Sequence, residues 1–299
     1  MQLTIAWWNT ALSPSKRRDR ASPEEKLVAC EVVRMLTEEL GVDLILLAEV
    51  SEADIDAIES AGVTVGYRTV RAMNPAGRGY FDVCVLHKAN ALEVSDPTDI
   101  LLEIDARTSR IAQRFDVVVA SASQPLHVFA SHWPSPATIG KFDPDRWRLG
   151  DRLRSPVDDI LKADANANVI LVGDYNDEPF DYSVSLYLRA SRDAEFVVDR
   201  PTLLYNPFWR HLSSFDHGAP EPLTDRGTYL HQGGTVTRWR TFDHMMFSSS
   251  FLRSSGGWTL DEHRTRVLDF PGFTELVVNR THVFDHLPIL GRIYRSSTP

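Results

Sequence analysis

Short runs of apolar residues, each ended by turn-forming or charged residues, recur along most of the chain. Runs of four to eight such residues between turn signals are typical of buried β-strands. The pattern predicts strands at residues 2–9, 42–50, 63–70, 82–88, 114–120, 126–131, 169–172, 241–247 and 288–294.

Apolar residues at helical spacing predict fewer helices than strands. Residues 22–25, "SPEE", combine an N-cap serine, a proline at the first helical position and a glutamate that closes a capping box. Apolar residues then repeat at helical spacing as far as Gly41, a typical C-terminal stop. Ser51 predicts another helix start, and residues 145–162 predict an amphipathic helix that Pro156 is expected to kink or divide.

The order of these elements indicates the fold class. Several strands follow one another without a helix between them, which does not suit an alternating β/α barrel but suits mixed α/β sheets with helices packed outside. No Pro- or Ser-rich linker marks a boundary, so residues 1–299 are predicted to form a single domain. Residues 199–240, rich in Pro, Gly, His and aromatics, are expected to be a loop insertion within it.

The net charge and the local basic clusters limit the kinds of partner that the chain is expected to bind. The net charge of −9 argues against a protein that coats nucleic acid through bulk electrostatics, but not against an enzyme that holds a phosphodiester through metal ions and local arginines. Basic clusters occur at residues 15–20, 146–154 and 237–240. No apolar run approaches membrane-spanning length, so no stable membrane association is expected.

The two cysteines, Cys30 and Cys84, both lie in apolar runs and are too few for a disulfide framework or a zinc cluster. The N-terminus enters a strand pattern directly, without a basic leader segment. A cytoplasmic location is therefore the default expectation, and the oligomeric state is left open.

Polar residues stand where predicted strands end or begin. Each alone has an ordinary structural explanation, such as a turn residue, a solvated strand exit or a packed core histidine. Together they favour a ligand or metal site at one edge of the sheets. They are Asn9, Glu49, His132, Asp174, Asn176, Asp243, Asp285 and His286.

These residue types suit the hydrolysis of a phosphate ester. Glu49, Asp285 and the Asn9 amide offer hard oxygen ligands without a thiolate, a set that favours Mg²⁺ or Mn²⁺ over zinc. An aspartate beside a histidine forms a general-base pair that removes a proton from water. Asp174 and Asn176 are placed to position the nucleophile or to help the leaving oxygen, and a second histidine to donate to a phosphoryl oxygen.

The order and spacing of these motifs resemble the endonuclease/exonuclease/phosphatase superfamily. That superfamily includes pancreatic-type deoxyribonuclease, exonuclease-type AP endonucleases, neutral sphingomyelinases and inositol-polyphosphate 5-phosphatases. "LLAEV" at 46–50 resembles its metal-binding glutamate strand, "GDYNDEP" at 173–179 its GD-x-N motif, and "FDHLPI" at 284–289 its terminal S-D-H-x-P-[IV] motif. The resemblance extends from "WWN" at 7–9 to "FDHLPILG" at 284–291.

The resemblance implies a four-layer α/β sandwich with two mixed sheets face to face and the site at one edge. It further implies that Asn9 and Glu49 hold a Mg²⁺ ion, or Mn²⁺, with help from Asp285.

The catalytic roles follow from the same resemblance. His286, oriented by Asp243, would activate the water. Asp174 and Asn176 would position the nucleophile and the scissile phosphate. His132 would contact a non-bridging phosphate oxygen or act near the leaving group.

Two features depart from the family pattern, and one pair of residues has no counterpart in it. Phe284 stands where the last motif usually has serine. Phe129 and His132 stand where AP endonucleases of the superfamily carry tyrosine and asparagine, which disfavours abasic-site repair. Asp177 and Glu178 match no family role and are expected only to close the turn.

The sequence therefore predicts a Mg²⁺-dependent phosphodiesterase, with DNA as the expected substrate. Arginines beside aromatics, in "RWR" at 146–148 and 238–240, are expected to contact the nucleic-acid backbone and to stack on bases. The alternative is a phosphatase or sphingomyelinase-like phosphodiesterase acting on a phospholipid or inositol phosphate. The aromatics of residues 205–212, if exposed, would favour that alternative. A non-catalytic binding module is disfavoured, because every expected site position is filled.

Overall fold

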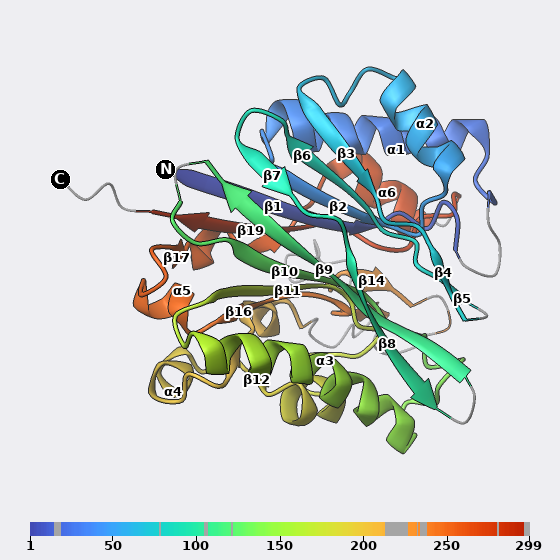
Figure 1. Cartoon of the computed structure of the whole chain (residues 1–299). Coiled ribbons are helices and arrows are strands. Elements are labelled where there is room, and N and C mark those ends of the chain that lie inside the picture. The colour runs from blue at the N-terminus through green and yellow to red at the C-terminus, as the bar shows by residue number, and fades with distance from the viewer. Residues whose placement is uncertain are drawn as a thin grey trace.

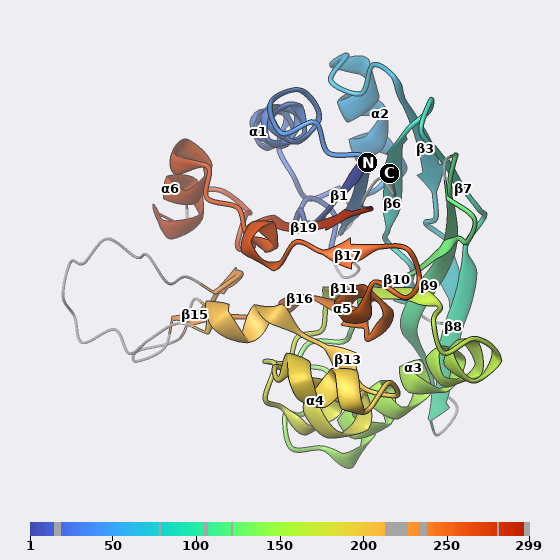
Figure 2. The same ribbon diagram turned by 90° about the vertical axis from the view of Figure 1, so that its left-hand side faces the viewer.

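The protein is a four-layer α/β sandwich in which two mixed β-sheets pack face to face and helices cover their outer faces (Figure 1). Figure 2 shows the same layers after a quarter turn, with α1 and α6 beside the first sheet and α3 and α4 beside the second. The fold class predicted from the sequence is confirmed. The computed structural model describes residues 1–14, 19–77, 79–104, 107–120, 122–212, 227–231, 233, 238–279 and 281–295.

The first sheet pairs the first strand of the chain with the last. β1 pairs antiparallel with β19 and parallel with β2, and the Met1 amino group donates to the Arg295 carbonyl oxygen over 3.1 Å. The strand order is β17-β19-β1-β2-β6-β3, and β18 also pairs with β19. The bounds are β1 Gln2–Asn9, β2 Leu44–Ala48, β3 Tyr67–Arg71, β6 Cys84–Lys88, β17 Thr259–Leu260, β18 Arg266–Val267 and β19 Ile289–Tyr294.

The second sheet aligns three of the predicted site residues. In its register, Asp174 at the end of β11 lies opposite His132 of the parallel strand β10 and opposite Asp243 of the antiparallel strand β16. The strand order is β12-β13-β16-β11-β10-β9-β7, and β8 also pairs with β9. The bounds are β7 Leu92–Val94, β8 Thr98–Ile104, β9 Arg107–Val119, β10 Leu126–His132, β11 Asn168–Asp174, β12 Ala190–Ser191, β13 Leu204–Tyr205 and β16 Asp243–Ser248.

Gly173 permits the close approach of β10 and β11. A Cβ atom at this position would collide with the backbone carbonyl of Ser131, its partner on β10. The glycine in "VILVGD" is therefore explained by strand packing immediately before the site.

The helices, single turns and short hairpins complete the fold. They are α1 Pro23–Arg34, η1 Met35–Glu39, α2 Glu52–Ser60, α3 Pro144–Ala163, η2 Ser183–Tyr187, α4 Ala194–Asp199, η3 Pro207–His211, α5 Ser250–Arg253, η4 Glu262–Arg264 and α6 Pro271–Asn279. The hairpins are β4 Pro75–Ala76 with β5 Gly79–Tyr80, and β14 Tyr229–Leu230 with β15 Trp239–Arg240.

The capping signals at the start of α1 and α2 are confirmed. Ser22 and Glu25 form a reciprocal capping box, as do Ser51 and Asp54. Pro156 was expected to kink or divide the third helix, and it does not divide it, because α3 runs through it. The apolar residues of α3, which are spaced four apart, pack into the core against the second sheet. This packing offsets the loss of the backbone hydrogen bond that Pro156 cannot donate. These core residues are Leu149, Leu153, Val157 and Leu161.

Alternation along β1 divides the apolar core into layers. Trp7 packs between the two sheets, and Trp8 packs on the other face of the first sheet, against Phe273 of α6. Phe284 is buried and stacks on Trp8 with a centroid distance of 5.9 Å. The residue that departs from the family serine therefore extends the outer core.

Some predicted elements differ from the structure at their ends. β3 begins at Tyr67, after a turn at 61–66, and β9 begins well before residue 114. β7 and β8 were not predicted. Residues 15–18 of the first basic cluster, Thr237 of the last one and much of the expected 199–240 insertion lie outside the described residues.

Two further findings concern the cysteines and the helices. Cys30 and Cys84 are buried free thiols, as expected. Within the described part of the chain, every helix is too short or too polar to cross a bilayer.

Candidate active site

The predicted site residues meet at one edge of the sandwich. His132, Asp174 and Asp243 come from the second sheet, where they share the register described above. Asn9 ends β1 of the first sheet, and Glu49 follows β2 directly. The loop of Asp285 and His286 leads into β19, and Asn176 follows Asp174.

His286 and Asp243 form a buried pair across the two sheets. His286 Nδ1 lies 2.7 Å from Asp243 Oδ2, and the Trp7 indole N–H donates to Asp243 Oδ1 over 2.8 Å. The Asp243 backbone N–H donates to Thr228 Oγ1 over 2.9 Å. Burial opposes ionisation, but His286 and the side-chain hydrogen bonds of Thr228 and Trp7 hold the pKa of Asp243 below its ordinary value. The pair has the geometry of an imidazole with a fixed tautomer.

His132 forms a second pair, with Asp82, that sequence reasoning missed. His132 Nδ1 lies 3.0 Å from Asp82 Oδ2, and Arg110 Nη1 donates to the same oxygen over 2.8 Å. Although burial opposes it, Arg110 and His132 lower the pKa of Asp82 far below its ordinary value. The sequence did hold one local signal for Asp82. Phe81-Asp82 stands at the start of an apolar strand, as Phe242-Asp243 does.

Asp174 lies between the two pairs. Its Oδ2 is 3.7 Å from His286 Nε2 and 3.9 Å from His132 Nε2. Asn9 Nδ2 donates to the same oxygen over 3.1 Å, and the Asn176 backbone N–H donates to Asp174 Oδ1 over 2.8 Å. Burial raises the pKa of Asp174, with Asp243 adding to the effect. Two imidazoles therefore face one carboxylate from opposite pairs.

Glu49 and Asp285 are the most accessible carboxylates of this group. Their side chains are 16% and 27% exposed, whereas those of Asp174 and Asp243 are 2% and 0% exposed. Glu49 Oε1 lies 3.6 Å from His132 Nε2, and Asp285 Oδ1 lies 3.9 Å from His286 Nε2. Burial raises the pKa of Glu49 to about 7, with Asp82 and Asp285 adding to the effect. The negative charge of each carboxylate is neutralised only in part by nearby cationic groups.

The backbone of Glu49 is in the left-handed region, with φ of 54°. Its carbonyl oxygen accepts from the Ser13 N–H over 2.7 Å and from Thr10 Oγ1 over 3.1 Å. Such a conformation costs free energy in a non-glycine residue and persists only where the surroundings fix it.

Two groups of side chains at this edge offer ligands that could hold a hard divalent cation, namely the accessible carboxylates Glu49 and Asp285 and a buried group around Asp174. Ligand atoms of Asp174, Asp243 and His286 also lie within 4.8 Å of one another. However, the Asp243 oxygens are already bonded to His286 and Trp7 and are closed to solvent. The accessible carboxylates are thus better placed to receive a cation, and their oxygens are the ligands that Mg²⁺ prefers.

Asn9 contributes to the site through Asp174. Its Nδ2 donates to Asp174, and its Oδ1 accepts from the Ala11 N–H over 3.1 Å. A carbonyl oxygen has two lone pairs, so Oδ1 keeps one for a further partner. Its role as a metal ligand stays a prediction.

Tyr229 is a further site residue that the sequence did not indicate. Its ring centroid lies 4.7 Å from that of His286 and 5.2 Å from that of Phe242. Burial raises the pKa of Tyr229 to about 12, and Asp285 and Asp174 contribute. The phenol therefore faces the acidic group, from a hairpin within the segment expected to be an insertion.

The predicted role of the "RWR" arginines is wrong for the first of them. Arg146 is 1% exposed and binds Asp177, so it is not available to a substrate backbone. Arg240 donates to Glu178 over 3.2 Å, and Trp239 is buried. Asp177 and Glu178 therefore anchor arginines, which is more than closing a turn.

The aromatics of residues 205–212 are also mostly buried. Tyr205 is 4% exposed and Phe208 is fully buried, while Trp209 is partly exposed. Most of this segment is therefore core, which removes the signal that favoured a membrane surface.

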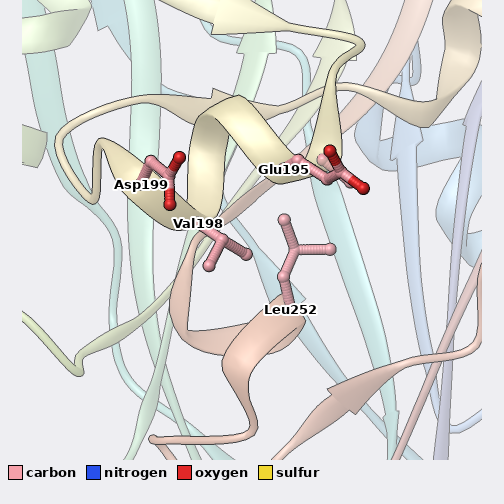
Figure 3. A pocket seen from close by; sticks show the side chains of 5 residues that line it. Glu195, Val198, Asp199 and Leu252 are labelled. Atoms are coloured by element: carbon pink, nitrogen blue, oxygen red, sulfur yellow. The ribbon is translucent and has the colours of Figure 1, made fainter.

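A separate pocket of about 400 Å³ lies between α4 and α5 (Figure 3). None of the predicted site residues lines it. It is therefore not part of the candidate site. Its lining residues are Ala194, Glu195, Val198, Asp199 and Leu252.

Solved structures share this fold at low sequence identity. An endonuclease/exonuclease/phosphatase family protein from Bacteroides thetaiotaomicron matches with 15% identity and a TM-score of 0.62, covering 99% of this chain and 98% of that chain. D. rerio TDP2 complexed with single-strand DNA product matches with 16% identity and a TM-score of 0.62, covering 98% and 99%. A mannosyl-6-phosphatase from B. thetaiotaomicron matches with 13% identity and a TM-score of 0.59, covering 98% and 99%.

Sequence comparison identifies the family. A search among curated proteins returns no match. The model of the endonuclease/exonuclease/phosphatase family matches residues 15–270, most of the chain. The chain therefore belongs to the endonuclease/exonuclease/phosphatase family, whose members are metal-dependent phosphoric ester hydrolases.

Proposed function

We propose that this protein is a Mg²⁺-dependent phosphodiesterase that hydrolyses DNA. The observation that supports it best is the arrangement of two histidine–aspartate pairs on either side of Asp174, beside two accessible carboxylates. One imidazole serves to remove a proton from water and the other to donate to the phosphoryl group.

The roles are divided between the two histidines. His286 Nε2 faces Asp174 and accepts the proton of the attacking water, while Asp243 holds the opposite ring nitrogen and stabilises the imidazolium that forms. His132 Nε2 donates to a non-bridging phosphate oxygen. Asp174 and Asn176 orient the water and the scissile phosphate.

Glu49 and Asp285 would hold the divalent cation, with Asn9 Oδ1 as the third oxygen. When bound, the cation polarises the phosphoryl oxygens and supplies positive charge that offsets the carboxylates. The protein groups show why that charge matters. Burial opposes protonation, but Asp243, Asp174 and Asp285 raise the pKa of His286 to about 10. His286 must lose that proton before it acts as a base, so part of this negative charge has to be neutralised.

A nucleic-acid substrate is supported by aromatic and cationic side chains beyond the turn of Asn176. Phe180 is 45% exposed, and Lys141 Nζ lies 5.7 Å above its ring. Trp209 lies 6.3 Å from Phe180 between ring centroids, with the Arg192 guanidinium 5.4 Å above it. One exposed and one partly exposed ring, each flanked by a cation, suit stacked bases and their phosphates. The shared fold with TDP2 bound to single-strand DNA product agrees with this proposal.

The alternative is a phosphatase for a small phosphate ester. The shared fold with a mannosyl-6-phosphatase favours it, and so does the burial of Arg146, which removes one expected contact to a nucleic-acid backbone. A small substrate would use the same histidine pairs without the rings around Phe180.

The test is turnover by the purified protein on a panel of phosphate esters with Mg²⁺, Mn²⁺ or EDTA. The panel holds single-stranded DNA, plasmid DNA, RNA, sphingomyelin vesicles, an inositol phosphate and a sugar phosphate. We expect cleavage of DNA with Mg²⁺ and none in EDTA. Glu49→Gln is the matched control, because it keeps the side-chain shape but removes charge from the cation site.

Two outcomes contradict the proposal. Full activity after exhaustive chelation rules out the cation-dependent mechanism. Hydrolysis of only the sugar phosphate or the inositol phosphate, with DNA left intact, establishes the phosphatase alternative instead.

A further inference from the structure

Arg146 is a buried arginine behind the edge of the sandwich where the candidate site lies, which we call the catalytic edge. It lies in the first turn of α3 and is 1% exposed. Its Nε donates to Asp177 Oδ1 over 2.6 Å, and Ser183 Oγ donates to Asp177 Oδ2 over 2.5 Å. The anion that pairs with this arginine is therefore itself fixed in place.

The remaining donors of Arg146 join the two turns that leave the catalytic strands. Nη1 donates over 2.8 Å to the carbonyl oxygen of Pro134, two residues beyond His132. Nη2 donates to the carbonyl oxygens of Tyr175 over 3.1 Å and of Asn176 over 2.6 Å. One planar group thus holds the exits of β10 and β11 in a fixed relative position.

Asn176 needs such a restraint. Its backbone is in the left-handed region, with φ of 50°, which asparagine adopts more readily than other non-glycine residues but still at some cost in free energy. Its Nδ2 donates to the Trp133 carbonyl oxygen over 3.0 Å and to Asp174 Oδ2 over 3.2 Å. Rotation of the turn would displace the backbone N–H and the amide that both orient Asp174.

We propose that Arg146 is a positioning residue for phosphoester hydrolysis, which sets the orientation of Asn176 and Asp174 relative to His132 by holding the carbonyl groups of both turns. It reaches no reacting atom. The proposal rests on the proposed roles of Asp174 and Asn176, but not on the identity of the substrate.

α3 supplies a matched control in Arg154. This arginine is also buried, at 2% exposed, and its Nε donates to the carboxylate of Asp158 over 2.8 Å. Its Nη2 donates over 2.6 Å to the carbonyl oxygen of Thr202, and Nη1 lies 3.5 Å from that of Leu188. It thus makes the same kinds of contact, but to turns outside the catalytic edge.

The experiment compares Arg146→Lys with Arg154→Lys, using bis(p-nitrophenyl) phosphate and Mg²⁺ at a temperature below both melting transitions. We expect both variants to melt earlier than the wild type. Only Arg146→Lys should lose kcat, by roughly 10–100-fold with little change in KM, because small misplacements of catalytic groups have costs of this size. Hydrogen exchange without cation should rise at residues 175–178 in Arg146→Lys alone.

A second variant removes the buried charges together. Arg146→Met with Asp177→Leu replaces the ion pair by apolar side chains, an exchange that folded proteins often tolerate, and leaves the turn carbonyls unheld. We expect a folded protein with the same loss of kcat.

Equal kcat in the wild type and either folded Arg146 variant overturns the proposal. So does an equal loss in the Arg154 control, which would indicate a general effect of stability. Asn176→Ala tests the roles of Asn176 and Arg146 separately. Wild-type turnover in this variant would refute the role of Asn176. Loss of activity in Asn176→Ala, together with full activity in Arg146→Lys, would refute only the role of Arg146.

Discussion

The two histidine–aspartate pairs of the site are built alike but differ in what else binds the aspartate. Each pair joins the two sheets, since Asp243 and His132 belong to the second sheet while His286 and Asp82 precede strands of the first. Among the described residues, the Asp243 carboxylate has neutral side-chain partners besides His286: the Trp7 indole N–H donates to it, and the Thr228 side chain also lowers its pKa by hydrogen bonding. Asp82 is shared between His132 and the cation of Arg110.

This difference suggests different tasks for two similar pairs. An aspartate whose charge is not shared stabilises an imidazolium strongly, which suits the histidine that takes up a proton. Arg110 opposes the protonation of His132, although the pKa of His132 remains raised, against the effect of burial, by Asp82 and Glu49. The Asp82 pair is therefore suited to orienting a donor more than to accepting a proton.

The largest expected effect comes from breaking the His286–Asp243 pair. His286→Ala should lower kcat by ~10²–10⁴-fold, the usual value of general-base assistance. Asp243→Ala should damage the same step, and the double variant should cost little more than one change, because the two residues act as a unit. Turnover and thermal melting of both singles and the double variant test this. Multiplicative losses in well-folded proteins would contradict the pairing.

The next effect is the protonation of His286 in cation-free protein. Its pKa of about 10 lies above the ordinary 6.5, so its proton stabilises the fold fully below pH 6.5, and this contribution is lost as the pH rises through about 10. Imidazole NMR titration in EDTA should show the raised value, and Mg²⁺ should lower it. A His286 pKa near 6.5 in the absence of cation would contradict the inference that the negative charge of this site requires a cation at Glu49 and Asp285.

Breaking the second pair should cost less. Asp82→Asn removes one charge-assisted hydrogen bond, and such bonds contribute about 1.5–3 kcal/mol, or roughly 10–100-fold in rate if lost from the transition state. The pKa of His132 should fall, so the alkaline limb of the pH–rate profile should move to lower pH. An unchanged profile would show that Asp82 only packs the site.

The smallest effect is expected from removing the charge of Arg110, a change that would make the second pair resemble the first. Arg110→Gln should raise the pKa of His132, because Asp82 would no longer be shared with a cation, and should change kcat by less than about tenfold, because the pair with His132 stays in place. Arg110→Lys, which keeps the charge, is the control and should leave the pKa of His132 near the wild-type value. A fall in that pKa for Arg110→Gln would reverse the electrostatic assignment.

The sequence by itself determined the fold class and indicated most of the polar residues that meet at the site edge. Strands and their polar ends are local signals, since a buried run and the turn residues after it lie within one short segment. The register of β10, β11 and β16 then brings His132, Asp174 and Asp243 together because all three stand at strand ends. The ligand set and the catalytic roles stay predictions.

Only the tertiary structure decided which partner each polar side chain meets. Asp82 pairs with a histidine 50 positions later, and Tyr229 faces His286 from a distant hairpin. Arg146 was expected to contact a substrate at the surface but is buried, because a carboxylate and carbonyl groups from two other turns satisfy its donors there. Burying a charge is stable only when such partners converge, and their convergence depends on the packing of the whole chain, which no single segment of the sequence specifies.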